Sequence, residues 1–451
     1  MHSDSSKQLF SPGWGRWKKG GYFRGSDWER GRSGGKKREQ TAALTGQSRL
    51  LLTVNGLFAV GNALSGTFVN VYLWKARQDF ALLGWFTLIH HLTMAFTFWL
   101  AGKWVKEHNK MNCLRAGVAV SALFYLVVLW LGAAAVDYFP LLGIIQGMSS
   151  GFFWIAFNVV YFEVTSPANR DKFNGWAGLL GSLAGMIAPW VSGFLIVRME
   201  AASGYRLIFT MSLVIFLIGV VCSFFLKKRK SVGRYEWFLT LRCLKRAETP
   251  WRTVGLALVA QGMREGVFGF MIALMVYIAT GTEMKIGNFS LITSAVALFS
   301  FMIVGRLLKP SHRKWAMFAG AFVMVAVIVP FFWRVNYATL LVFGVGVALF
   351  TPLYTIPMTS SVFDLIGQFE ESVKKREEYI VMRELGLNAG RMLGTLIFTF
   401  VVMRTTSPTA INWLLLGIGS SPLLAWFFMR RQLGQLSLSE KAAAAAKKAA
   451  R

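Results

Sequence analysis

Two ionisable residues lie side by side in the middle of an apolar stretch. Arg264 and Glu265 occur in the segment AQGMREGVFGF. A charge at the centre of a bilayer costs about 2.5 to 3.5 kcal/mol even on a lenient insertion scale, so it is retained mainly beside a partner or a wet cavity. Adjacent helical residues point about 100° apart, so at least one should face a partner helix or water. The two readings are a functional cavity and a structural interhelical pair.

A second apolar stretch carries a polar stripe. Glu384, Asn388, Arg391 and Thr395 recur at steps of four, three and four, which places them on one helical face. Glycines at 386, 390 and 394 form another stripe, which suits close packing on a neighbouring helix. Arg391 lies deepest. It is therefore the leading candidate for contact with an anionic or polar group of a bound molecule, and the alternative is a structural pair with an acid such as Glu265.

Glu265 and Glu384 are the candidate proton carriers of these two stretches. Burial favours the protonated form of a carboxyl group and a nearby Arg favours the ionised form, so a proton and a bound molecule can compete for one site. His90 and His91 are also adjacent within an apolar block. A hydrogen-bonded packing role is favoured for them over a proton relay.

Neutral polar residues mark two further blocks. Asn62 lies near the centre of residues 51 to 74, with Asn55 on the same face, and Trp154 and Asn158 are four residues apart in a later block. Lining of a cavity and simple interhelical hydrogen bonding are equally open for the asparagines.

Twelve apolar blocks position these residues. Each is close to the roughly 20 residues that a helix needs to cross a bilayer. The predicted spans are 51–74, 80–101, 112–135, 138–163, 174–197, 205–226, 253–279, 287–308, 315–333, 338–363, 382–403 and 410–429.

The composition agrees with a membrane protein. The 451 residues are 55% hydrophobic and 16% charged, whereas a soluble domain carries about 25% charged residues. This excludes a soluble enzyme, and 38 Phe with 17 Trp exclude a disordered chain. The three cysteines and five histidines show no metal-ligand spacing. We expect no metal and no cofactor.

The net charge of +28 follows the membrane rather than a nucleic acid. Most of the 49 Lys and Arg lie on the side that holds both ends of the chain, and few lie on the other, namely Lys75, Arg77, Arg198, Arg206, Lys285, Arg334 and Arg404. Positive loops stay in the cytoplasm, so both termini are predicted to be cytoplasmic. Residues 1–49 are predicted to be a disordered basic tail and residues 431–451 a low-complexity tail.

The second half of the chain repeats the first with a shift near 203 residues. The sequence GKWVKEHNKMNCLRAGVAV from Gly102 matches GRLLKPSHRKWAMFAGAFV from Gly305, and LGSLAGM from Leu180 matches LGLNAGR from Leu385. Glu163 and Asp364, each closing a span, also correspond. The matches predict two six-span bundles, residues 50–226 and 253–430, joined by a basic central loop over residues 227–252.

Here the chain resembles the major facilitator superfamily of secondary transporters. The resemblance covers roughly residues 50–430, and it rests on the two six-span halves, the long central loop and the basic turns after spans 2 and 8. The family's turn reads G-x-x-x-D-R/K-x-G-R/K-R/K. The residues that fit it are Gly102 and Lys110 in the first turn and Gly305, Arg313 and Lys314 in the second. Lys106 and Lys309 stand where the family has Asp, which makes a charge pair in gating.

The resemblance implies which helices line a central path, namely helices 1, 4, 7 and 10. It thereby favours as wall residues Asn62, Trp154, Asn158, Arg264, Glu265 and Tyr354. Pro352 and Pro357 should kink the tenth span, either as part of a gate or as a static bend. The glycines of span 5 loosely resemble the antiporter motif of the superfamily, which favours export.

These observations predict a twelve-helix, all-α membrane protein of the plasma membrane. We expect a monomeric secondary transporter that moves a small organic solute by alternating access, coupled to protons. The alternatives are a lipid or glycolipid flippase of the same fold and a membrane scaffold without transport. A membrane-embedded transferase ranks last, because no catalytic constellation is found, and nucleic acid is not an expected partner.

Overall fold

The computed structural model describes residues 44–165, 169–199, 201–228, 233–245, 250–368 and 374–434. Twelve helices in this part of the chain are long and apolar enough to cross a membrane. The prediction of an all-α, twelve-span protein is therefore confirmed. Most of the two predicted tails falls outside the described residues. Helix begins at Gly46, and the last candidate span runs to Gly434.

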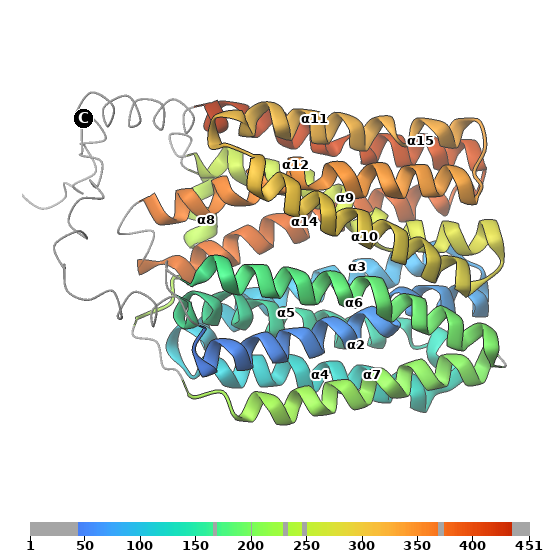
Figure 1. Cartoon of the computed structure of the whole chain (residues 1–451), viewed down its shortest axis with the longest axis horizontal. Helices are drawn as coiled ribbons and strands as arrows, with labels where there is room; N and C mark the ends of the chain where they lie inside the picture. The colour runs from blue at the N-terminus through green and yellow to red at the C-terminus, as the bar shows by residue number, and fades with distance from the viewer. Residues whose placement is uncertain are drawn as a thin grey trace, which may run out of the picture. The chain divides into compact units, whose positions relative to one another are not determined.

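The spans follow the chain in two sets of six, and the helices of each set pack on one another (Figure 1). The first set consists of α2 (Gly46–Arg77), α3 (Phe80–Glu107), α4 (Lys110–Leu131), α5 (Phe139–Val164), α6 (Arg170–Arg198) and α7 (Ala201–Phe224). The second set consists of α9 (Trp251–Thr280), α10 (Glu283–Leu307), α11 (Arg313–Ala326), α12 (Tyr337–Gln368), α14 (Arg376–Val402) and α15 (Pro408–Gly419).

Successive spans alternate in direction, which defines two ends of the bundle. We call the end at which α2 begins the terminal end and the opposite end the far end. The short connections are set by local capping. The Asp79 carboxylate accepts a hydrogen bond from the Ala81 N–H (2.8 Å) and starts α3, and the Asn109 side chain accepts one from the Met111 N–H (3.2 Å) and starts α4.

Large apolar side chains cover the outside of the bundle, as a lipid-facing surface requires. Trp130 at the end of α4 and Trp333, just after the 3₁₀ turn η3 (Val329–Phe332) that follows α11, are each 80% exposed. The two tryptophans are 203 residues apart, so they occupy the same position in the two halves of the repeat. Tryptophan favours the boundary between lipid and water, and both lie at the far end.

Two helix pairs join the halves. Helix α3 packs on α14, and α6 packs on α10. Glycines allow the second pair to approach closely at the far end, where a Cβ on Gly287 would lie 2.9 Å from the Pro189 carbonyl oxygen and one on Gly193 would lie 2.6 Å from the Glu283 carbonyl oxygen. The far end is therefore closed by backbone contact between the halves.

Helices α9 and α14 pack backbone to backbone within the second half. A Cβ on Gly266 would lie 2.8 Å from the Cα of Arg391, and one on Gly394 would lie 2.9 Å from the carbonyl carbon of Met263. The glycine stripe predicted for close packing thus lies against α9. This contact brings the polar stripe of α14 beside Arg264 and Glu265.

The predicted central loop contains a helix that the sequence analysis did not anticipate. Helix α8 (Leu239–Lys245) packs on α9 and α14. Leu239 and Cys243 are both buried and lie one turn apart. They are four positions apart and so share one face of the helix, which is a short apolar face within a segment of basic composition.

Candidate functional site: a charge cluster at the terminal end and an ion pair at mid-depth

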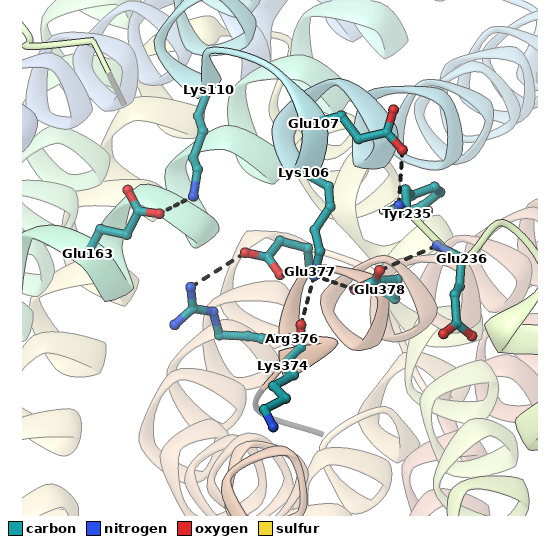
Figure 2. Close-up of polar contacts among 10 residues, drawn as sticks. All are labelled: Lys106, Glu107, Lys110, Glu163, Tyr235, Glu236, Lys374, Arg376, Glu377 and Glu378. Atoms are coloured by element: carbon teal, nitrogen blue, oxygen red, sulfur yellow. Dashed lines mark hydrogen bonds and ion pairs between the residues drawn. The ribbon is translucent and has the colours of Figure 1, made fainter. Parts of the chain in front are cut away.

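Lys106, in the last helical turn of α3, reaches across to the second half of the chain (Figure 2). Its ammonium group is 2.9 Å from a carboxylate oxygen of Glu377 and 3.2 Å from one of Glu378, and it donates to the Lys374 carbonyl oxygen at 2.8 Å. Lys106 is 5% exposed. All three of its donors are engaged, so this buried cation holds the start of α14 against α3. We call these four residues the terminal cluster.

In the terminal cluster, the turn carries a charge of the sign opposite to that of the family. The family carries Asp at this position of the turn, whereas here the turn supplies the cation and α14 supplies two carboxylates. A charge pair is therefore formed at this turn, with reversed polarity. Lys110, four residues on, pairs instead with Glu163 at the end of α5, within the same half.

A stretch of the central segment covers the terminal cluster. The Tyr235 N–H donates to a carboxylate oxygen of Glu107 (3.0 Å), and the Glu236 N–H donates to Glu378 (3.4 Å). The Glu236 carboxylate is also 2.7 Å from the ammonium of Lys375. Burial, and then the charge of Glu378, raise the pKa of the Tyr235 phenol well above its usual value. The segment thus contacts both halves at the terminal end.

The described residues place no such cover over the corresponding turn of the second half. Lys309 is exposed, and a Cβ on Gly305 would meet no atom within 4 Å. Arg313 pairs with Asp364 at 2.8 Å, which matches the pair between Lys110 and Glu163. Lys314 lies over the ring of Trp315, with its nitrogen 5.5 Å from the ring centre.

The polar residues of α9 and α14 meet at mid-depth. Arg391 donates to one carboxylate oxygen of Glu265 through Nη2 (2.7 Å) and Nε (3.1 Å), and its Nη1 donates to Asn388 (3.2 Å). The other oxygen of Glu265 accepts from the Gln261 amide at 2.7 Å. Of the two readings of Arg391, the structure thus shows the ion pair with Glu265. The Glu265 side chain is nevertheless 37% exposed, so this pair is not sealed in a dry contact.

Arg264 follows a different course from its neighbour Glu265 and is not part of this hydrogen-bonded pair. Its guanidinium carbon lies 4.6 Å from the ring centre of Phe268. Within the described parts of the chain, no carboxylate lies within 4.0 Å of it, and its Nε has no hydrogen-bond partner. The hydroxyl of Tyr354 is likewise buried without a partner among these residues, and it interacts electrostatically with Arg264.

A pocket of about 520 Å³ opens beside Arg264 and Glu265. Its walls come from α9, α10 and α12, all of the second half, and we call it the second-half pocket. The lining residues are Arg264, Glu265, Phe268, Gly269, Ile272, Phe289, Thr293, Ser294, Ala297, Phe343, Gly344, Val347 and Ala348. Two residues singled out from the sequence are therefore brought to one cavity of ligand size.

Other residues singled out from the sequence lie elsewhere. Asn62 donates to the Phe58 carbonyl oxygen of its own helix (3.0 Å), and Trp154 packs edge-on against Phe58 on the first-half side. Asn158 is half-buried, one turn from Trp154 on α5. Glu384 pairs with its neighbour Arg383. None of the residues named here, nor Tyr354, is part of the lining of the second-half pocket.

The sequence analysis missed both carboxylates of the terminal cluster. Glu377 and Glu378 precede the predicted start of the eleventh span at residue 382, so they were assigned to a loop. The double acid in KKREEY, next to a run of basic residues, was the available signal. Gln261 was missed as well, although it lies one turn before Glu265 on the same face.

One further carboxylate joins the halves at the far end. Glu283 at the start of α10 accepts hydrogen bonds from the ammonium of Lys75 (2.9 Å) and from the hydroxyl of Tyr205 (3.0 Å), both of the first half. It is 6% exposed. Each end of the bundle therefore has a buried ionic contact between the halves.

Comparison with known proteins places these features in a family. Residues 51–369 match the model of the Major Facilitator Superfamily. The chain is 41% identical over 381 residues to the uncharacterized protein YqgE of Bacillus subtilis (strain 168), covering 84% of this chain and 88% of that protein. It is also 40% identical over 202 residues to an uncharacterized protein in the sodM 3' region of Geobacillus stearothermophilus, which covers 44% of this chain and 94% of that one.

Solved structures share the fold. A bacterial homologue of the iron transporter ferroportin in an inward-facing state superposes with a TM-score of 0.64 at 17% identity, over 87% of this chain and 99% of that one. A D-xylose-proton symporter gives 0.63 at 12% identity, over 86% and 97%. The two six-helix halves, the Gly-led basic turn that begins at Gly102 and the match to the family model all indicate the same family. The chain belongs to the major facilitator superfamily.

Proposed function

We propose that this protein is a proton-coupled secondary transporter that carries a small organic solute by alternating access. Membership of the superfamily supports secondary transport across a membrane. The coupling ion, the solute and the direction are our proposal, and Glu265 is the observation that carries it. It is the one carboxylate among the residues that line the second-half pocket, and it is partly exposed there while it holds Arg391.

Protonation of Glu265 would weaken its attraction to Arg391. The ion pair joins α9 to α14, so its strength depends on whether the carboxylate carries a proton. Binding in the pocket and protonation of Glu265 thereby both act on α9, which lines the pocket and is joined to α14 by the pair.

Helix α14 connects this pair to the terminal cluster. Arg391 lies fourteen residues after Glu377, or about 20 Å along a helix that rises 1.5 Å per residue. A shift of α14 at Arg391 would therefore also move Glu377, and so change its contact with Lys106 of the first half. We propose that the terminal cluster, in the turn Gly102 to Lys110, is a gate that must break when the solute leaves or enters at the terminal end. The contact of Glu283 with Lys75 is the corresponding gate at the far end.

The distribution of basic residues supports cytoplasmic termini and hence a cytoplasmic terminal end. We propose a plasma-membrane location, a monomer and transport out of the cell. A reporter enzyme that is active only in the cytoplasm, fused to the C-terminus, is expected to be active. Activity of an externally active reporter at the same position would overturn the orientation.

The coupling is tested in proteoliposomes with a compound panel, with and without a pH gradient. Glu265→Gln is expected to abolish gradient-driven accumulation and to leave solute exchange intact. Glu384→Gln is the matched comparison, because Glu384 is also a helix carboxylate but pairs with Arg383 outside the second-half pocket.

Three outcomes decide against the proposal or part of it. Coupling that is lost in Glu384→Gln and kept in Glu265→Gln would move the proton carrier to Glu384. Normal accumulation in both variants would remove protons from the mechanism. Movement of labelled lipid, with no movement of any soluble compound, would identify a flippase instead.

A further inference from the structure

We propose that the solute is an amphipathic organic anion, whose negative group binds Arg264 and whose apolar body fills the second-half pocket. This inference rests on the proposed function, since it names the class of solute for the same site. It starts from the charges around the pocket and from the way the hydroxyl groups of its lining are already used.

Among the described residues, Arg264 is the charged group of this site that forms no ion pair, although its neighbour Glu265 attracts it electrostatically. Glu265 is occupied on both oxygens, by Gln261 at 2.7 Å and by Arg391 at 2.7 Å. Arg264 lines the same pocket without an ion-pair partner among the described residues. Counted with the pair of Glu265 and Arg391, the site therefore carries one excess positive charge.

An excess charge at membrane depth favours an anionic ligand. A buried unpaired charge is costly, and an anion would supply the ion-pair partner that the described residues do not. A cationic solute would add to the excess positive charge, and an uncharged solute would leave Arg264 without an ion-pair partner. The guanidinium group presents several donors in one plane, which suits a carboxylate or sulfonate.

The remaining walls select an apolar body rather than a sugar. Phe268 and Phe343 stack with ring centres 5.7 Å apart, and Phe289 also lines the pocket. The two hydroxyl groups of the lining already donate to backbone carbonyls, Thr293 to Phe289 (2.8 Å) and Ser294 to Gly185 (3.1 Å). A polyol would therefore find few free partners, whereas aromatic or aliphatic carbon would contact the phenylalanines.

The test is binding to the purified full chain in detergent, measured by equilibrium dialysis. The probes are 2-naphthalenesulfonate, 2-naphthol and 1-naphthylmethylamine, which share one ring system and differ in charge. We expect the sulfonate to bind at least about tenfold more tightly than the other two, as one charge-assisted contact provides. Arg264→Gln should remove that advantage. Arg264→Lys, which keeps the charge, should retain most of it.

A second pair of variants tests the location without touching a charge. Gly269 lines the pocket, and a Cβ there would meet no atom within 4 Å, so Gly269→Leu should place its side chain in part of the pocket. Gly417 of α15 has equally open surroundings and does not line the pocket. We expect Gly269→Leu to abolish sulfonate binding and Gly417→Leu to leave it unchanged, with both variants eluting as folded protein in size-exclusion chromatography.

The inference fails if the three probes bind alike, if Arg264→Gln binds the sulfonate as the parent chain does, or if Gly269→Leu has no effect. Its failure is distinguishable from failure of the proposed function. Transport of a neutral or cationic compound that still depends on Glu265 would overturn the anion alone. Binding of the sulfonate through Arg264, with accumulation unaffected by Glu265→Gln and Glu384→Gln, would overturn proton coupling alone.

Discussion

The turns after α3 and α10 are copies of one another in the repeat, yet they are used differently. Both form an ion pair within their own half, Lys110 with Glu163 and Arg313 with Asp364. In the first turn, Lys106 is buried against α14 of the other half. In the second turn, the corresponding Lys309 is exposed. The repeat thus supplies corresponding residues twice, and among the described residues the contact between halves that Lys106 makes has no counterpart at Lys309.

The central segment accounts for part of this asymmetry. A chain of two repeats has one linker, and here residues 233–238 lie over the first turn. A Cβ on Gly102 would be 2.6 Å from the Tyr235 hydroxyl, whereas the same atom on Gly305 would meet nothing within 4 Å. The linker excludes water from one of two related turns and so strengthens its charge contacts.

The largest expected effect comes from the lysine that distinguishes the turns. Lys106→Met removes the cation that the buried carboxylates of Glu377 and Glu378 share and leaves Arg376, 3.5 Å from Glu377, as the remaining cation. Removal of one partner of a buried pair costs about 3 to 5 kcal/mol. Lys309→Met should change stability by less than about 0.5 kcal/mol, because the residue is exposed. Melting temperatures of the purified variants test this.

The control for that prediction adds Glu377→Gln and Glu378→Gln to Lys106→Met. Neutralising both carboxylates should restore most of the lost stability. Equal melting temperatures for Lys106→Met and Lys309→Met would show that the burial of Lys106 does not make its turn contribute more to stability.

The ion pairs within each half, Lys110 with Glu163 and Arg313 with Asp364, should differ less in their contribution to stability. Lys110 is 1% exposed at its side chain, so Lys110→Gln should cost about 1.5 to 3 kcal/mol. Asp364 is 49% exposed, so Arg313→Gln should cost at most about 1 kcal/mol. Added salt should weaken only the second pair's contribution. The reverse order in thermal melts would show that the two pairs are not used as their burial indicates.

The two glycines sharpen the comparison without altering charge. Gly102→Val forces the valine against the Tyr235 ring and should cost about 1 to 3 kcal/mol, whereas Gly305→Val should be nearly neutral. Once Tyr235 is replaced by Ala, adding Gly102→Val should cost little more. If Gly102→Val still costs about 1 to 3 kcal/mol when residue 235 is Ala, the clash is not with the Tyr235 side chain.

The smallest effect is expected at the linker itself. Glu236 and Lys375 form a partly exposed pair at 2.7 Å, so Glu236→Gln should cost at most about 1 kcal/mol. It should still raise amide hydrogen exchange locally in residues 233–245, since the contact ties that segment to the second half. Unchanged exchange there would mean that backbone contacts alone hold the linker.

Much of the fold was predictable because lipid imposes a simple rule on sequence. Twelve apolar blocks and the repeat were sufficient to place the spans and assign the family. Boundaries were less predictable, because polar ends such as that of α14 extend beyond the hydrocarbon core. That extension is why Glu377 and Glu378 were assigned to a loop.

The candidate site was predictable in part. Charge at membrane depth identified Arg264, Glu265 and Arg391, and helical spacing placed the last of these on a stripe with Asn388. The sequence could not decide which acid Arg391 would contact, since that depends on how α9 and α14 cross. It also could not show that the phenylalanines of α10 and α12 complete the pocket wall.

Trp130 and Trp333 could report the movement of one half against the other that the proposed alternating access requires. The pair occupies equivalent corners of the molecule, and both indoles face outward where headgroups would begin. When one lobe tilts against the other, these indoles must change depth relative to each other. Quenching by lipids brominated at graded depths, read from chains that retain one or the other tryptophan, would report that tilt while leaving the pocket and gates untouched.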